Sequence, residues 1–188
     1  MGGCLLLRGQ GTPTPLGQKP SLVAPQRREP LKLPLSKPHI VVQKSKRQLL
    51  LYASGQIVRT YPIALGLCPI PNKVHEGDRC TPEGLFYITQ KNAHSKFHRS
   101  LGLSYPNAAA AERGLRDGLI TKRQYHQIKK ALKEGRSPPQ DTPLGSYILI
   151  HGGGSQQDWT WGCVALDDRD IRELFKAIPI GAKVKIEH

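Results

Sequence analysis

The chain has 188 residues, of which 38% are hydrophobic, with four cysteines and a formal net charge of +14. This length suits one globular domain with an attached linker, and the apolar content is sufficient for a core. No segment approaches the ~20 consecutive apolar residues of a membrane-spanning helix, so we expect no transmembrane segment.

Residues 1–38 differ in composition from the rest of the chain. They contain seven prolines and six basic residues against one acidic residue. Proline interrupts helices and sheet ladders, and so polar a segment has little to bury. We therefore predict a disordered or extended linker over 1–38 and one folded domain over 39–188. The apolar run Cys4 to Leu7 is shorter than the roughly 7–15 residues of a secretory signal, so the chain as given shows no export signal.

From His39 onward most segments are rich in branched and aromatic residues, which favours strands. The predicted strands are HIVVQ (39–43), QLLLYA (48–53), QIVRTYPIAL (56–65), GLFYITQ (84–90), SYILI (146–150) and AKVKIE (182–187). Ser54 and Gly55 separate the second and third, which indicates a hairpin. The nearly continuous apolar run at 146–150 predicts a strand that is buried on both faces.

Two segments have helical periodicity. Residues 120–135 carry a loose apolar stripe, with Thr121 as a candidate N-cap and Gly135 as a candidate end. Residues 167–178 carry apolar side chains with the spacing of one helix face, and Asp167 is a candidate N-cap. The sequence therefore predicts a mainly antiparallel β domain with a few helices.

The net charge favours an acidic partner such as nucleic acid, an anionic membrane surface or an acidic polymer. The basic residues are scattered, and only three Phe and two Trp are available to stack on bases. No nucleic-acid-binding motif is recognisable, so we expect no nucleic-acid partner.

The cysteines Cys4, Cys68, Cys80 and Cys163 form no C-x-x-C pair, which argues against a zinc ribbon or a thioredoxin-like site. Cys68 and Cys80 flank a turn-rich loop, and an oxidising compartment would allow a bridge between them. Sequence does not give their geometry, so both the bridged and the free state stay open.

The segment IHGGGSQQDWTWGCVAL places His151 directly after a predicted buried strand and Cys163 before another apolar run. If the second run pairs beside the first, the imidazole and the thiol meet across the loop. An imidazole can activate a thiol as a nucleophile, and we expect the pKa of Cys163 to fall below the ~8.5 of a free thiol. The alternative is a buried structural cysteine near a histidine with satisfied hydrogen bonds.

A metal site is a further alternative. His94 and His98 are four residues apart and would share a helix face, with Cys80 or His75 as a third ligand. The segment QKNAHSKFHRS has no clear helical pattern, so we predict polar loop residues and no metal.

Region 39–187 resembles the L,D-transpeptidase catalytic domain of the YkuD family, because six segments match in the family's order. They are KRQLLLYASGQIVRTYPIALG, GDRCTPEGLFYI, SKFHRSLGLSYPN, IHGGG, TWGCVAL and IPIGAKVKIE. The resemblance implies an antiparallel β-sandwich with a few helices. The insertion 108–140 is longer than in minimal members of the family. It is expected to form a helical lid, a wall on the acceptor side of the site, or a pair of helices on the surface.

The resemblance also implies roles for individual residues. Cys163 is the nucleophile, His151 is its base, and the carbonyl of Gly152 holds the imidazole. Residues around the cysteine and one upstream tyrosine are expected to form the oxyanion and substrate site: Gly162, Trp161, Thr160 and Tyr105. The family usually has Arg or Asn two residues after the cysteine, whereas this chain has Ala165, so substrate handling is expected to differ.

By the same resemblance, the thiolate attacks an L,D bond of a peptidoglycan stem peptide, releases a terminal D-Ala and forms a thioester. An amine of another stem then makes a 3–3 cross-link; a cell-wall-anchored lipoprotein or water is another acceptor. This implies a role in peptidoglycan biosynthesis, cell-wall organisation and cell shape in the periplasm or cell envelope. We expect the protein to be a monomer and to need no cofactor. We also expect carbapenems to acylate it. Two alternatives are an L,D-carboxypeptidase, a hydrolase on the same fold, and a non-catalytic wall-binding module.

Overall fold

The structure, a computed structural model, describes residues 28–188, and its folded unit spans Leu31–His188. In chain order the elements are β1 (His39–Gln43), β2 (Gln48–Ala53), β3 (Gln56–Pro62), β4 (Gly84–Ser95), β5 (His98–Leu103), α1 (Ala108–Arg116), α2 (Lys122–Lys133), β6 (Leu149–His151), β7 (Val164–Ala165), α3 (Asp168–Ala177) and β8 (Lys183–Glu187). No helix in this part of the chain has the length and apolarity needed to span a membrane.

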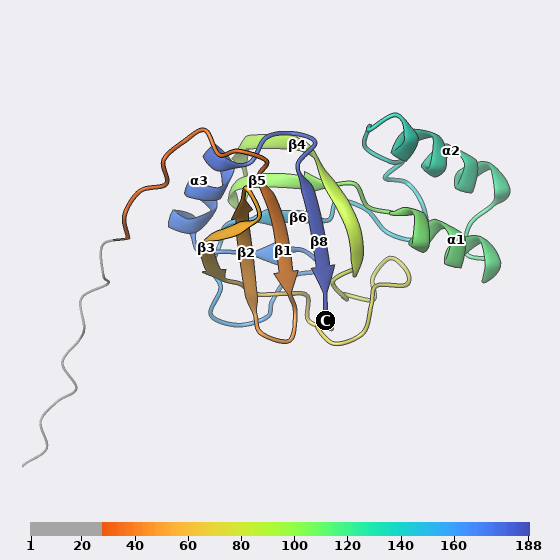
Figure 1. Cartoon of the computed structure of the whole chain (residues 1–188). Coiled ribbons are helices and arrows are strands. Elements are labelled where there is room, and N and C mark those ends of the chain that lie inside the picture. The colour runs from red at the N-terminus through yellow and green to blue at the C-terminus, as the bar shows by residue number, and fades with distance from the viewer. Residues whose placement is uncertain (1–27) are drawn as a thin grey trace, which may run out of the picture. The chain divides into compact units, whose positions relative to one another are not determined.

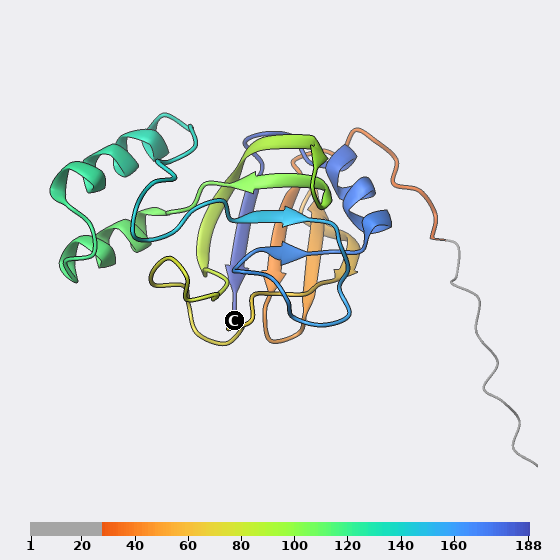
Figure 2. The ribbon, with the colours of Figure 1, turned by 180° about the vertical axis from the view of Figure 1, so that it is seen from behind.

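The strands form one sheet in the order β3-β2-β1-β8-β4-β5-β6-β7. The long strand β4 joins two layers, because its first residues pair with β8 and its later residues pair with β5. Figures 1 and 2 show β5, β6 and β7 crossing β1, β2 and β8 on one side. The predicted mainly β class with a few helices is therefore confirmed, although β1–β8 and β6–β7 are parallel pairs.

The core lies between these layers and follows from the alternation of the strands. Ile40 and Val42 of β1 are buried opposite Val184 and Ile186 of β8, while the residues between them face outward. Alternate side chains of a strand point to opposite faces, so this pattern fixes which face each strand presents to the core. Helix α3 adds its apolar stripe to the same core.

Most predicted elements are present, with shifted ends. Ser54 and Gly55 both have positive φ and form the turn between β2 and β3. Thr121 caps α2 in a capping box with Gln124, and Gly135 takes a positive φ just beyond its end. The strand expected at 146–150 is reduced to Leu149–His151, and β5, β7 and α1 were not predicted as separate elements.

Asp167 precedes α3 as predicted, but its side chain does not cap the helix. Its Oδ1 instead accepts hydrogen bonds from the N–H and the hydroxyl of Ser155 and from the amide of Gln156. The carboxylate therefore ties the glycine-rich loop to the start of α3. The prediction of an N-cap is corrected on this point, because a long-range partner takes the acceptor.

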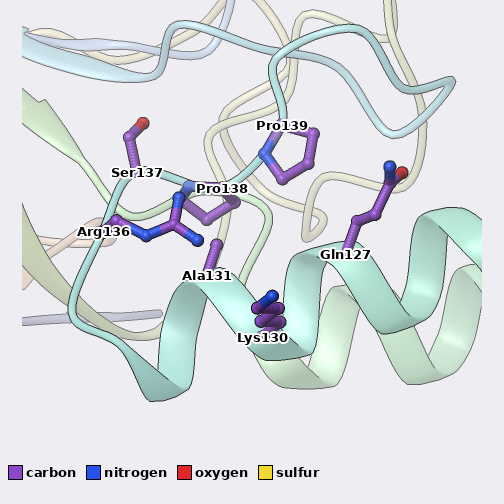
Figure 3. Close-up of a pocket in the computed structure, with 7 residues that line it drawn as sticks. All are labelled: Gln127, Lys130, Ala131, Arg136, Ser137, Pro138 and Pro139. Carbon is purple, nitrogen blue, oxygen red and sulfur yellow. The ribbon is translucent and has the colours of Figure 1, made fainter.

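The insertion 108–140 folds as a helix pair with a small core of its own. The buried apolar side chains of this second cluster are Ala111, Ile120, Ile128 and Leu144. Figures 1 and 2 show α1 and α2 beside the sheet in both views. A pocket of about 310 Å³ lies between the end of α2 and residues 136–139 (Figure 3). It belongs to the insertion and has no residue in common with the His151–Cys163 segment.

The folded unit begins upstream of the predicted boundary at His39. Leu31 and Leu35 are partly buried and pack against the main core, and the N–H of Ser54 donates to the carbonyl of Ser36. The rest of the predicted linker, residues 1–27, lies outside the described part of the chain.

Lys44 is the one lysine among the largest fully buried side chains of residues 28–188, at 0% exposure. Its Nζ lies 2.8 Å from Glu83 Oε1 and donates to the carbonyls of Ile70, Pro71 and Thr81 at 3.3, 3.1 and 3.1 Å. A buried ammonium is tolerated only where hydrogen bonds replace its water shell. Lys44 therefore fixes the middle and the end of the loop between β3 and β4 to the turn between β1 and β2.

We expect Lys44→Met to lower the free energy of unfolding by about 3 kcal/mol, because Glu83 and the carbonyls lose their cation. Lys46→Met, at an exposed position of the neighbouring turn, is the matched control and should change it by no more than about 0.5 kcal/mol. Urea denaturation of both variants measures the difference. Similar losses in the two variants would contradict the role given to Lys44.

Candidate active site

Parallel pairing of β6 and β7 sets the positions of the histidine and the cysteine. Ile150 pairs with Val164 and His151 with Ala165, so Cys163 lies at the entry to β7 beside β6. The N–H of Leu149 donates to the Cys163 sulfur at 3.4 Å, and the sulfur lies 3.5 Å from the carbonyl oxygen of Tyr147. The structure thus pairs the two runs as the sequence suggested.

His151 is buried, and its ring has a fixed orientation. Nδ1 lies 2.6 Å from the carbonyl oxygen of Gly152. A carbonyl only accepts hydrogen bonds, so Nδ1 carries the proton and Nε2 keeps its lone pair. Gly152 itself is held because its N–H donates to the carbonyl of Phe97 at 3.0 Å. This arrangement gives a neutral imidazole with a free basic nitrogen.

Two aromatic side chains enclose the imidazole. Phe97, between β4 and β5, stacks on His151 at 4.4 Å between ring centroids, and Trp159 meets it edge-on at 5.5 Å. Burial lowers the pKa of His151, although the hydrogen bond to Gly152 opposes the shift. The ring is therefore neutral at pH 7. Sequence reasoning missed Phe97 and Trp159; their only signal was an aromatic residue within the segments SKFHRS and DWTWG.

Cys163 does not have the low pKa that we expected from the sequence. The residue is half-buried, but its sulfur is enclosed by protein atoms, and this desolvation raises the thiol pKa to about 11. The Leu149 N–H and the charge of Lys73 lower the pKa by less. Within residues 28–188 no hydrogen bond joins Cys163 to His151. The resting pair is therefore a neutral thiol and a neutral imidazole, not a thiolate with an imidazolium.

The turn that carries the thiol is closed by Thr160. Its hydroxyl donates to the carbonyl of Cys163 at 2.8 Å and accepts the N–H of Gly162 at 3.2 Å. The Gly162 N–H is thus already used. In the described chain no acceptor is recorded for the N–H groups of Trp161 and Cys163, so these are the donors available to an oxyanion.

Cys68 and Cys80 form a disulfide, which settles the alternative left open by the sequence. Cys163 is the free cysteine of the described chain. The disulfide loop lies directly against the turn that carries Cys163: a Cβ on Gly162, whose φ is +120°, would come within 2.8 Å of the Cys80 carbonyl oxygen. Glycine is required there both by its positive φ and by this contact.

The remaining predicted residues differ in their exposure. Trp161 is 68% exposed, and the guanidinium of Arg79 lies 4.9 Å from its ring centroid. Tyr105 is 1% exposed, and its hydroxyl donates to the carbonyl of Leu144 at 2.8 Å. Its assignment to the substrate site is therefore corrected: Tyr105 is a core residue that anchors the segment before β6. Ala165 is fully buried and pairs with Ala64 across β7.

A groove of about 1220 Å³ lies beside the residues that contact His151 and Cys163. It is lined by residues 90–97 of the β4–β5 hairpin together with Ser100, Tyr147 and Leu149. Tyr147 and Leu149 also contact the Cys163 sulfur, and Phe97 stacks on His151. The groove is large enough for a short peptide.

The residues of the metal alternative do not form a site. Cys80 is in the disulfide, and His94 and His98 lie on β4 and β5 and not on one helix face. Residues 28–188 contain no group of three or more His, Cys, Asp or Glu side chains able to hold a metal ion.

Among solved structures, the helical cell shape determining protein Pgp2 (K307A mutant) of Campylobacter jejuni matches with a TM-score of 0.53 and 21% identity, over 82% of this chain and 48% of that one. An L,D-transpeptidase of Xylanimonas cellulosilytica matches with a TM-score of 0.47 and 16% identity, over 85% and 65%. One from Mycobacterium smegmatis matches with a TM-score of 0.48 and 9% identity, over 81% and 59%. The chain thus spans between about half and two thirds of these proteins. A search of the curated proteins finds no match.

A comparison with protein families matches the YkuD family, described as the L,D-transpeptidase catalytic domain, over residues 37–186. The match takes in every strand and helix of the folded unit except the last residue of β8, Glu187. The chain therefore belongs to the L,D-transpeptidase catalytic domain family.

Proposed function

We propose that this protein is a peptidoglycan L,D-transpeptidase with Cys163 as its nucleophile. The main support is the hydrogen bond from His151 Nδ1 to the Gly152 carbonyl, which leaves Nε2 as a base on the strand that adjoins the cysteine. The half-enclosed thiol, its free N–H neighbours and the adjoining groove supply the other parts that acyl transfer needs. Family membership supports peptidoglycan as the substrate.

In the acylation step, the Cys163 sulfur attacks the carbonyl carbon of the L-centre residue while His151 Nε2 takes the thiol proton. The N–H groups of Trp161 and Cys163 stabilise the oxyanion. When the tetrahedral intermediate collapses, the bond to the terminal D-amino acid breaks, and the imidazolium gives its proton to the leaving amine. A thioester on Cys163 remains.

In the second step an amine attacks the thioester. His151 takes a proton from the amine and returns it to the sulfur, which restores the neutral thiol and leaves a new amide bond. A stem-peptide amine gives a 3–3 cross-link, and a lysine of a wall-anchored protein gives an attached protein. No step requires a cofactor. We place the activity in the periplasm or cell envelope, where the substrate lies and where a disulfide such as Cys68–Cys80 persists.

The proposal predicts that the protein joins purified stem tetrapeptides into dimers with loss of the terminal D-amino acid, observable by mass spectrometry. Cys163→Ala should abolish the reaction without loss of fold, because the thiol forms the covalent bond. A carbapenem should add once to the unmodified protein and not to this variant.

Cys4→Ala, which replaces a cysteine outside the described part of the chain, is the control and should retain acylation at Cys163. Turnover by Cys163→Ala would rule out the mechanism. Trimmed monomers without dimers would instead assign water as the acceptor.

The neutral resting pair predicts two different pH profiles. Iodoacetamide labelling of Cys163 follows the thiolate, so its rate should rise up to about pH 11. Acylation by substrate needs only neutral His151, whose pKa is lowered, so this rate should fall only at pH below the ordinary histidine value of about 6.5.

His151→Ala should slow substrate acylation by roughly 10²–10⁴-fold and remove the acidic fall in its pH profile. Its labelling by iodoacetamide should keep an inflection above that of a free thiol. A labelling inflection below ~8.5 in the unmodified protein would instead indicate a preformed thiolate.

A further inference from the structure

Arg79 is an exposed cation in the disulfide loop, and its guanidinium lies 4.9 Å from the ring centroid of Trp161. Within residues 28–188 the structure records no ion pair for it. Its guanidinium lies over the Trp161 ring, and among these residues no hydrogen bond from its N–H groups is recorded. These N–H groups form a fork that matches a carboxylate. Arg79 is therefore an oriented cation without an anionic partner.

The backbone holds Arg79 in place. Its φ is +58°, and its carbonyl accepts the N–H of Cys68 at 3.1 Å. The next residue, Cys80, is fixed by the disulfide and by a hydrogen bond from its N–H to Asp78 at 3.0 Å. A positive φ costs a residue with a Cβ about 1 kcal/mol or more, so the surrounding contacts must impose it.

This loop also places Arg79 close to the reaction centre. Trp161 is two residues before Cys163, so their Cα atoms are at most about 7.6 Å apart. The Cys80 carbonyl lies against Gly162, and the Arg79 carbonyl lies against Gly66, where a Cβ would come within 2.1 Å. Movement of the loop relative to the nucleophile turn is therefore small.

Two of the other cations near the site already have partners, and a third, Arg99, lies over the ring of Phe175 on α3. Lys73 is buried and lies 2.7 Å from Asp78, and Lys91 donates to the carbonyl of Ile178 at 2.8 Å. His151 is neutral, as its lowered pKa requires. Lys96 lines the groove, but in the described chain no recorded contact orients its ammonium group. Arg79 is thus the oriented cation available to a substrate.

We propose that Arg79, supported by Trp161, binds a carboxylate of the stem peptide and so acts as a specificity residue of this enzyme. This rests on the proposed function, which supplies a peptide with a free carboxylate at its D-terminus and further carboxylates on its side chains. The guanidinium contacts Trp161, and the recorded contacts of the Cys163 sulfur are with Leu149 and Tyr147, so Arg79 selects and orients the donor and takes no part in proton transfer.

Binding of a stem tetrapeptide to the full chain carrying Cys163→Ala tests this without turnover, by calorimetry at low salt. Arg79→Gln in that background should weaken binding about tenfold, as expected for loss of one charge-assisted hydrogen-bonded pair. Arg79→Lys should lose less. Arg123→Gln, which removes an exposed charge on α2, is the matched control and should bind as the background does.

Amidated peptides identify the carboxylate. One peptide carries an amide at its C-terminus and another carries an amide on its side-chain carboxylate. The amide that removes the recognised carboxylate should weaken binding by the Cys163→Ala background to the level of Arg79→Gln. The same amide should not weaken binding by Arg79→Gln any further. Equal binding by the background and Arg79→Gln, an Arg79 effect that survives both amides, or no binding at all would overturn the proposal.

Turnover separates this proposal from the proposed function. With Cys163 intact, Arg79→Gln should raise KM about tenfold and leave kcat within about twofold, since the contact orients the donor. Arg79-dependent binding in a protein that never acylates would uphold the carboxylate site and refute the transpeptidase. Acylation with a KM that is unchanged in Arg79→Gln would uphold the transpeptidase and refute the carboxylate site.

Discussion

The site depends on a close contact between two loops. Glycine at position 162 lets the nucleophile turn lie on the Cys80 carbonyl, and glycine at position 66 allows a similar approach to the Arg79 carbonyl. The disulfide closes the loop on one side, and Lys44 fixes its ends on the other. The position of the Cys163 thiol is therefore set by contacts that are far apart in the sequence, and side chains larger than hydrogen at these two points would separate the loops.

Burial gives the site its resting charge state. It raises the pKa of Cys163 and lowers the pKa of His151, so both shifts oppose a thiolate–imidazolium pair. A thiol that stays protonated reacts slowly with general alkylating or oxidising agents. Reactivity then requires a substrate that brings its carbonyl to the sulfur and allows the proton to move to Nε2.

Local patterns were sufficient for much of this description. Runs of branched and aromatic residues located β1, β2, β3 and β8, and the segment from His151 to Cys163 indicated that the histidine and the cysteine lie on adjoining strands. Features decided by distant partners were not predictable in this way. Asp167 had the position of a cap but bonds to Ser155, and Tyr105 matched a family segment but is buried against Leu144. The prediction of a lowered thiol pKa was wrong for the same reason, since desolvation depends on the folded surroundings.

The burial of β7 limits which residues around Cys163 can contact a substrate. Val164 and Ala165 are both fully buried, one on each face of a two-residue strand, so neither position can present a charge to a substrate. The family usually places Arg or Asn at the second of these positions. On the other side of the cysteine, Gly162 has no side chain and Trp161 is exposed, so a cation has to reach the site from another segment. The proposed carboxylate site at Arg79 supplies such a cation from the disulfide loop, so the contact of this loop with Gly162 would serve that site as well as the position of the thiol.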